Sequence, residues 1–262
     1  MVDWMHKVDE QWLKERRNVV TATELVHLVP EFKRAEKAGR TNEVWPAFAA
    51  LWEQKHSEIE PDPYSFKAAA RGHYCEPYAI ESWNKQTSVK MYHWDDCIIC
   101  NNGLGFSPDG MNIEQPSTNC VRLNIDGKSM VGKGVRIDLM PTSLVEVKSY
   151  DIDHHTKSMV SNKMSKQLES ERMQMAVAMM VVPTLEEVNL ILFCPPARHS
   201  MAVRTYTKEE LSDEISLLEK VLSMWQVTCR EMNAYSEPFV SAFSEKEIES
   251  DYEAKTQDAF VI

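Results

Sequence analysis

Residues 144–148, Leu-Val-Glu-Val-Lys, constrain the fold more than any other segment, because they place two charges on a strand. Their alternation puts the two valines on one face of an extended chain and Glu146 and Lys148 on the other. A buried charge needs a partner or a bound cation, because it gives up strong hydration. The sequence therefore predicts a short strand with an apolar back and a charged front that is paired or binds a metal ion.

Ser-Pro-Asp-Gly at 107–110 predicts a tight turn, because proline, aspartate and glycine each favour a sharply bent backbone. The turn holds the Asp109 carboxylate at the end of one strand, and Glu146 offers a second carboxylate from the next. Val147 can add its backbone carbonyl, since its side chain points away, and Lys148 places a cation beside them. This is a minimal divalent-metal site suited to phosphodiester hydrolysis. The alternative for Glu146 and Lys148 alone is a surface ion pair between strands.

The composition favours a globular protein with a sizeable core, since 43% of the 262 residues are hydrophobic and 9% are aromatic. A net charge of −11 disfavours broad, non-specific binding to nucleic acid, although a locally basic channel or bound metal ions would offset it. The six cysteines are not clustered as in a small secreted domain, no run is long enough to cross a bilayer, and the N-terminus lacks an apolar signal region. We expect a soluble cytoplasmic protein without membrane association.

The remaining pattern predicts one α/β domain, in which helices flank a mixed central β-sheet. An extra hairpin, 121–125 with 135–139, precedes the Glu-Val-Lys strand. Residues 1–243 are assigned to a single domain with its core at about 65–206, and an acidic tail follows over 244–262. Helices are predicted over 4–17, 24–38, 43–56, 65–83 with an interruption at Gly72, 157–182, and 208–235 as a C-terminal helix. Strands are predicted over 88–94, 97–101, 144–148, 188–194 and 201–206.

Three motifs occur in an order that resembles a known superfamily. They are Gly-His-Tyr-Cys-Glu at 72–76, Ser-Pro-Asp-Gly at 107–110 and Glu-Val-Lys at 146–148. In this order they resemble the PD-(D/E)XK nuclease superfamily. More narrowly, they resemble the lambda-type phage exonucleases, also called YqaJ-like viral recombinases. The resemblance implies a PD-(D/E)XK nuclease core for this chain.

The resemblance continues toward both ends of the chain and covers about residues 12 to 195. Trp-Leu-Lys-Glu-Arg at 12–16 with Val-Thr-Ala-Thr at 20–23 is similar to the family's N-terminal motif, in which serine is usual where this chain has Thr23. Met-Gln-Met at 173–175 resembles the helix that carries the family's active-site glutamine. Two departures are a longer segment between the aspartate and glutamate motifs and an acidic C-terminal extension with no family counterpart.

The resemblance implies a role for each matched residue. The cofactor would be Mg²⁺, replaceable by Mn²⁺ in the same site and present as two ions, and its ligands would be Glu76, Asp109, Glu146 and the carbonyl of Val147. The catalytic residues would be Asp109, Glu146, Lys148 and Gln174. Lys148 would orient the attacking water and offset charge on the phosphate. Binding of the DNA 5′-phosphate would fall to Arg16 and Thr23, while Thr21 and Thr23 are both candidates to cap the following helix.

The implied activity is that of a metal-dependent exonuclease that digests one strand of linear double-stranded DNA from the 5′ end toward the 3′ end. The resemblance also implies a ring-shaped trimer that threads DNA through a central channel. Members of the family work with a single-strand annealing protein in recombination. A basic lumen would reconcile the acidic chain with DNA binding, and a phage origin would place the protein in the host cytoplasm.

Three alternatives compete with this interpretation. Cys97 and Cys100 have the spacing of a zinc-binding pair, with Cys120 and His93 as further candidates, but cysteines in a strand pattern usually pack as small core residues. A structure- or sequence-specific DNA endonuclease could use the same core. A non-catalytic DNA-binding or protein-interaction module could keep the fold without the chemistry.

Overall fold

The structure is a computed structural model that describes residues 10–57, 67–94, 97–114, 122–125, 130–132, 135–137, 141–160 and 166–234. The helices are α1 (Glu10–Arg17), α2 (Ala22–Lys37), α3 (Pro46–His56), α4 (Lys67–Gln86), α5 (Ile152–Val160), α6 (Lys166–Val181) and α7 (Ser212–Ala234). The N-terminal strands are β1 (Val20–Thr21), β2 (Tyr92–His93), β3 (Ile98–Asn101), β4 (Leu104–Phe106) and β5 (Gly110–Met111). The later strands are β6 (Arg122–Ile125), β7 (Met130–Gly132), β8 (Val135–Ile137), β9 (Ser143–Ser149), β10 (Glu187–Phe193) and β11 (Met201–Thr207).

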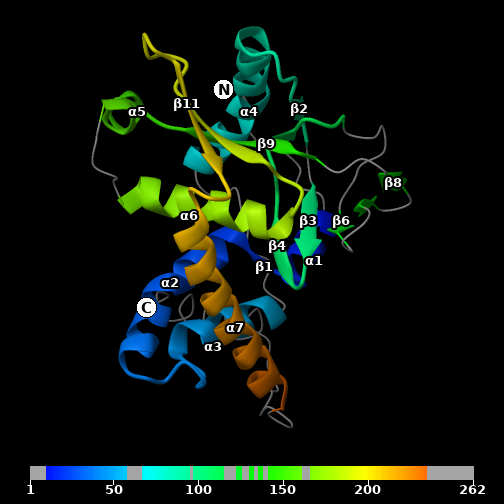
Figure 1. The fold of residues 1–262 in the computed structure, drawn as a ribbon, viewed down its shortest axis with the longest axis vertical. Coiled ribbons are helices and arrows are strands. Elements are labelled where there is room, and N and C mark those ends of the chain that lie inside the picture. Colours follow the sequence, from blue (N-terminus) through cyan, green and yellow to red (C-terminus); the bar gives the residue numbers. More distant parts are fainter. Residues whose placement is uncertain are drawn as a thin grey trace, which may run out of the picture.

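The strands form two mixed sheets, where the sequence predicted one central sheet, and helices flank them (Figure 1). One sheet has six strands in the order β1-β4-β3-β6-β7-β8, and the other has five in the order β11-β10-β9-β5-β2. In the five-stranded sheet, β9 runs parallel to β10 and antiparallel to β5. The predicted α/β class, with mixed β-structure between helices, is confirmed.

β9 lies between two layers of helix, and each of its faces meets a different one. Figure 1 shows the strand between α4 and α6. Val145 and Val147 join an apolar cluster with residues of α4 such as Ile80. Leu144 points the other way and joins the main core together with residues of α6. The alternation predicted from the sequence is therefore confirmed, and Glu146, which is 8% exposed, lies on the face of Leu144.

The start of α2 is held by a capping box. The Thr21 N–H donates to Glu24 Oε2 at 2.7 Å, and the Thr21 hydroxyl accepts from the Glu24 N–H at 3.5 Å. Thr21 is therefore the cap, and Thr23 lies in the first turn of the helix. At the other end the helix stops before Gly39, whose φ of 68° favours glycine, as the predicted helix end required.

Two predictions around α4 were wrong. Gly72 does not interrupt the helix, because a glycine in a helix costs only about 1 kcal/mol and the apolar face of α4 packs on β9. The strand predicted over 88–94 is reduced to β2. Side chains of α4 bind the backbone just before it: Trp83 Nε1 donates to a carbonyl at 2.8 Å, and Asn84 makes two hydrogen bonds of 2.7 Å to the backbone of Met91.

Two other predicted segments also differ from the structure. The predicted hairpin contains a third strand, because β6 pairs with β7 and β7 with β8, so that β6 and β8 are not partners. Alternation predicts that a segment is a strand, but its pairing partners depend on contacts distant in sequence. The helix predicted over 157–182 is two helices, α5 and α6, on either side of 161–165. α5 starts earlier than predicted, since the Asp151 carboxylate accepts a hydrogen bond of 2.8 Å from a backbone N–H in its first turn.

The C-terminal part of the described chain follows the prediction. β10 and β11 pair in antiparallel fashion, and α7 buries Leu218 and Trp225 on one stripe. None of the described helices is both long enough and apolar enough to cross a membrane. The start of the first predicted helix, Cys120 and the tail over 244–262 lie outside the described residues.

Gly110→Ala tests the close packing of β5 between α4 and β9. A Cβ atom at this position would lie 2.8 Å from Ile80 Cδ1, 2.9 Å from Val145 Cγ2 and 3.0 Å from the Tyr92 carbonyl oxygen. We expect the substitution to lower the free energy of unfolding by about 1–3 kcal/mol, because overpacking displaces the neighbours. Urea denaturation followed by circular dichroism measures this change.

Gly72→Ala is the matched control, since a Cβ atom there meets nothing within 4 Å. In the continuous helix, alanine should raise the free energy of unfolding by about 0.5–1 kcal/mol. Equal effects of the two substitutions would contradict the proposed packing of Gly110.

Candidate active site

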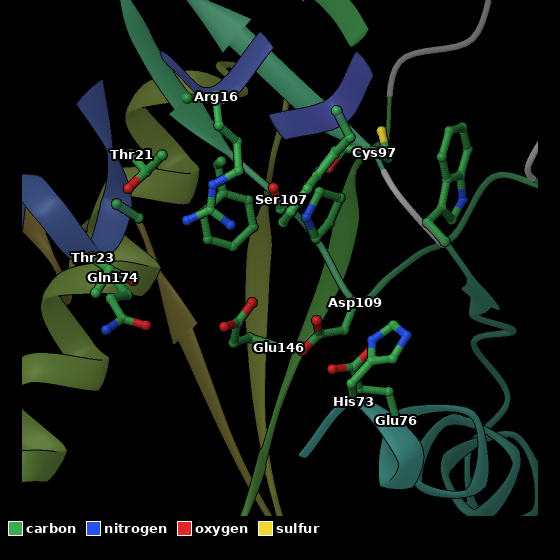
Figure 2. A pocket seen from close by; sticks show the side chains of 16 residues that line it. Arg16, Thr21, Thr23, His73, Glu76, Cys97, Ser107, Asp109, Glu146 and Gln174 are labelled. Atoms are coloured by element: carbon green, nitrogen blue, oxygen red, sulfur yellow. The ribbon is translucent and has the colours of Figure 1, made fainter. Parts of the chain in front are cut away.

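A cavity of about 190 Å³ lies where α1, the start of α2, α4, the turn before β5, β9 and α6 meet. Six residues selected from the sequence line it: Arg16, Thr23, Glu76, Asp109, Glu146 and Gln174. Figure 2 shows the three carboxylates in a row across the cavity, with the arginine above them and the threonine and glutamine to the left. The fold thus brings together motifs that are far apart in the sequence.

Asp109 is joined to β9 by a short hydrogen bond. The Val147 N–H donates to Asp109 Oδ2 at 2.6 Å, just beyond the point where Gly110 pairs with Val145. In a strand the N–H and C=O of one residue point to the same side, so the Val147 carbonyl lies on the edge that faces Asp109. The side chain of Val147 packs into the α4 cluster, away from the carboxylates, as the alternation predicted.

Glu146 and Lys148 form a partly buried ion pair at this cavity. Lys148 Nζ donates to Glu146 Oε1 at 2.6 Å, and the two side chains are 27% and 10% exposed. The other carboxylate oxygen, Glu146 Oε2, is buried and has no hydrogen-bond partner among the described residues. The alternative of an ordinary surface pair is therefore wrong. Lys148 is not among the residues that line the cavity, and it reaches the site through Glu146.

Glu76 is held by two histidines to which the sequence analysis assigned no role at this site. His73 Nδ1 lies 3.1 Å and His93 Nε2 lies 3.4 Å from the same oxygen, Glu76 Oε2. His73 also lines the cavity, and its spacing of three residues from Glu76 on a helix is a signal that could have identified it. No local signal identifies His93, because it reaches Glu76 only through the packing of β2 against α4.

The carboxylates raise one another's proton affinity. Burial raises the pKa of Asp109 well above its usual value, and the charges of Glu146 and Glu76 raise it further. Burial also raises the pKa of Glu146, although Lys148 opposes the shift. Burial alone would lower the pKa of Lys148, but Glu146 and Asp109 outweigh it, so the pKa is raised and the ammonium stays charged. Added positive charge would stabilise this cluster.

Glu171 is a further carboxyl group beside the site that the motifs did not select. It is 4% exposed and lies on α6, one turn before Gln174. Burial raises the pKa of Glu171 to about 7, while Lys148 lowers it and Glu146 raises it. A carboxyl group with a pKa so far above its usual range, close to other charges, is typical of functional sites.

The wall of the cavity opposite the carboxylates is suited to an anion. The Arg16 guanidinium lies over the Trp12 ring, 4.6 Å from its centroid, and lines the cavity. Thr23 is exposed in the first turn of α2, where backbone N–H groups and the helix dipole favour negative charge. Lys55, another residue that the motifs did not select, joins α3 to this wall by donating to the Arg16 carbonyl at 3.1 Å.

The carboxylate side of the cavity fits a divalent cation by its donor chemistry. Glu76, Asp109 and Glu146 offer hard oxygen ligands, and the buried Glu146 Oε2 lacks a partner among the described residues. Across the described part of the chain, no three His, Cys, Asp or Glu side chains are spaced as a ready-made ion cage. A cation here would therefore also draw on other oxygens, for which the Val147 carbonyl is suitably placed.

The alternative zinc site finds no support in the described residues. Cys97 and Cys100 are buried and pack into different apolar clusters, so they do not face a common ion. His93 lies against Glu76, and Cys120 lies outside the described residues. The cysteines act as small core residues, as their strand pattern indicated.

Solved structures share this architecture. An alkaline exonuclease (LHK-Exo) from Laribacter hongkongensis superposes with a TM-score of 0.51 at 16% identity, covering 87% of this chain and all of that chain (100%). A phage related exonuclease from Haemophilus somnus 129PT gives a TM-score of 0.53 at 13% identity, covering 83% of this chain and 96% of that one. This chain has the fold of these two exonucleases. The fold predicted from the sequence motifs is thereby confirmed.

Comparison of sequences adds nothing to this likeness. No protein-family profile matches the chain, and no curated protein matches it. At identities of 13% and 16% the structural likeness concerns the fold alone. What the site does must therefore be argued from its own side chains.

Glu171→Gln tests the effect of burial on this carboxyl group. Its pKa of about 7 in the folded state exceeds the ordinary value of 4.5, so the folded state binds the proton more tightly and loses stability as the pH rises through this window. The glutamine of the variant does not ionise, so the variant has no such loss of stability. Relative to wild type, the free energy of unfolding of the variant should therefore rise by about 1–3 kcal/mol between about pH 5 and about pH 8.

Urea denaturation in EDTA at both pH values measures this difference. Glu169→Gln, which changes an exposed carboxylate on the same helix, is the control and should show no such rise. A difference between Glu171→Gln and wild type that stays constant with pH would contradict the assignment.

Proposed function

We propose that this protein is a divalent-metal-dependent nuclease that hydrolyses phosphodiester bonds at the 5′ ends of double-stranded DNA. The observation that supports it is the convergence of Glu76, Asp109 and Glu146 in one cavity, with Arg16 on the opposite wall. Carboxylates on one side and an anion site on the other are what a phosphodiester and its catalytic cation require. The two exonucleases of the same fold are consistent with this activity.

In this proposal the carboxylate side of the cavity holds the cofactor, Mg²⁺ with Mn²⁺ as a substitute and two ions in all. Glu76, Asp109, Glu146 and the Val147 carbonyl are the proposed ligands. When bound, such ions lower the pKa of coordinated water and offset negative charge on the scissile phosphate. Val147 orients Asp109 through its N–H, and the short bond of 2.6 Å limits how far that carboxylate can rotate.

Lys148 and Gln174 are the proposed polar catalytic residues. Lys148 keeps its positive charge because Glu146 and Asp109 raise its pKa, so it can stabilise the charge that develops on the phosphate. Gln174 lines the cavity from α6 and can hydrogen-bond to water or phosphate there. Lys148 lies on the charged face of β9, and α6, which carries Gln174, packs on that face. Both side chains therefore approach the reacting group from the same side.

The opposite wall is the proposed site for the terminal 5′-phosphate. Arg16 can bind two phosphate oxygens through its planar guanidinium, and its position over Trp12 limits the orientations of that group. The hydroxyl of Thr23 and the N-terminus of α2 add hydrogen-bond donors. A terminal phosphate held here would leave the next phosphodiester near the carboxylates, which favours removal of nucleotides from the 5′ end.

The finer features follow from the resemblance to lambda-type exonucleases. They are digestion from 5′ to 3′, a homotrimeric ring around the DNA, and cooperation with a single-strand annealing protein. A ring with a basic lumen would reconcile the net charge of −11 with DNA binding. We propose the same features for this protein.

Digestion of linear duplex DNA in Mg²⁺ and in EDTA tests the proposed activity. We expect loss of one strand, only in Mg²⁺, from linear DNA and not from covalently closed circles. Lys148→Ala should reduce the rate by about 10²–10³-fold, because the preorganised positive charge is lost, while DNA binding in Ca²⁺ is retained. The rate is measured by release of acid-soluble nucleotides, and binding is measured by fluorescence anisotropy.

Three outcomes would count against the proposal. Cleavage of closed circles would favour the endonuclease alternative. Tight DNA binding without any cleavage in Mg²⁺ or Mn²⁺ would favour the non-catalytic module. Normal turnover by Lys148→Ala would overturn the assignment of that lysine.

Arg16→Gln tests the phosphate site separately from the chemistry. We expect wild type to digest 5′-phosphorylated ends faster than 5′-hydroxyl ends, and the variant to lose most of this preference with little change on hydroxyl ends, since one charged contact is worth about 1.5–3 kcal/mol. Arg17→Gln is the matched control, because Arg17 lines a different cavity with Lys55 and Trp52. Equal preferences in all three proteins would rule out Arg16 as the phosphate ligand.

A further inference from the structure

We propose that His73 and His93 are positioning residues that hold one oxygen of Glu76 and so direct its other oxygen to the cation site. The inference rests on the proposed function, since it assigns a role to residues around a proposed metal ligand. His73 lies within the motif at 72–76 but has no role assigned to it by the resemblance, and His93 lies outside the motifs. Their geometry in the structure supports the role.

Both imidazoles meet the same atom. His73 Nδ1 lies 3.1 Å and His93 Nε2 lies 3.4 Å from Glu76 Oε2. An ionised carboxylate only accepts hydrogen bonds, so each histidine donates, which assigns the proton to Nδ1 in His73 and to Nε2 in His93. Two donors from different elements on one oxygen restrict the rotation of the carboxylate. Both contacts end on Oε2, so Oε1 is the oxygen left to face a cation.

The two histidines also oppose the effect of burial on the pKa of Glu76. Burial alone would raise the pKa of Glu76, but the hydrogen bonds from His73 and His93 lower it, so that its pKa lies below the usual value. The pKa of Asp109 in the same cavity moves in the opposite direction.

The position of His93 is set by β2, which is fixed on both sides. Asn84 of α4 makes two hydrogen bonds of 2.7 Å to the backbone of Met91, two residues before His93. On the other side His93 pairs with Gly110 of β5, and the Trp94 N–H donates to the Asp109 carbonyl at 3.1 Å. The short strand therefore carries His93 to Glu76 and supports the backbone of Asp109 at the same time.

The test is Mn²⁺ binding, measured by electron paramagnetic resonance in the full-length protein without DNA. We expect His93→Ala to weaken Mn²⁺ binding by about 10–100-fold, as losses of groups that orient metal ligands usually do. His93→Gln keeps an amide donor and should recover most of the affinity. His73→Ala is the second variant and should show a similar loss. His27→Ala, which changes an exposed histidine of α2, is the control and should bind as wild type does.

Two observations would overturn the proposed positioning role of His73 and His93. One is unchanged Mn²⁺ affinity in both His93→Ala and His73→Ala. The other is strong coupling of the bound Mn²⁺ to ¹⁴N nuclei in pulsed spectra of wild type, lost in either variant, which would make the histidines direct ligands. Absence of Mn²⁺ binding in wild type would instead overturn both the metal-dependent function and the positioning role of the two histidines. Circular dichroism confirms that each variant is folded, and the two histidines on separate elements give two independent measurements.

Discussion

The hydrogen bond from the Val147 N–H to Asp109 Oδ2 joins β9, which carries Glu146, to the turn before β5, which carries Asp109. β5 and β9 are paired at two positions, Gly110 with Val145 and Met111 with Leu144. The bond of 2.6 Å extends this pairing at the point where the turn at 107–110 enters the sheet. β5 in turn pairs with β2, which sets His93 opposite Gly110. One small region of backbone therefore positions Asp109, the end of β9 and the contact between His93 and Glu76 of α4. Close packing in this region requires a glycine at position 110.

The site works against the stability of the fold that contains it. Burial and mutual repulsion raise the proton affinity of Asp109, Glu146 and Glu171, and Lys148 supplies positive charge among them. Breaking such a buried pair by removing one partner typically costs about 3–5 kcal/mol, because the other charge remains uncompensated. The apolar layers that α4 and α6 form on the two faces of β9 offset the desolvation of these charges. A charged cluster kept in this place is more readily explained by chemistry than by stability.

Much of the fold and of the site was predictable where the signal is local. Alternation identified β9 and the orientations of its side chains, and the Ser-Pro-Asp-Gly turn located Asp109 at a strand end. Features that depend on distant contacts were missed. His93 approaches Glu76 only because Asn84 and Trp83 bind the backbone before β2, and that same contact reduced a predicted strand to two residues. The third strand between 125 and 135 was missed for the same reason, as was the separation of α5 from α6.

The sequence by itself determined the types of the main elements, the charged face of β9 and the identities of six groups that line the cavity, because side-chain periodicity and turn chemistry act over a few residues. The tertiary structure decided which of those groups meet. It divided the strands between two sheets, brought His93 to Glu76, and placed Arg16 across the cavity from Glu146. These outcomes depend on packing between segments far apart in the chain, and a linear pattern carries no information about the direction from which a distant side chain arrives.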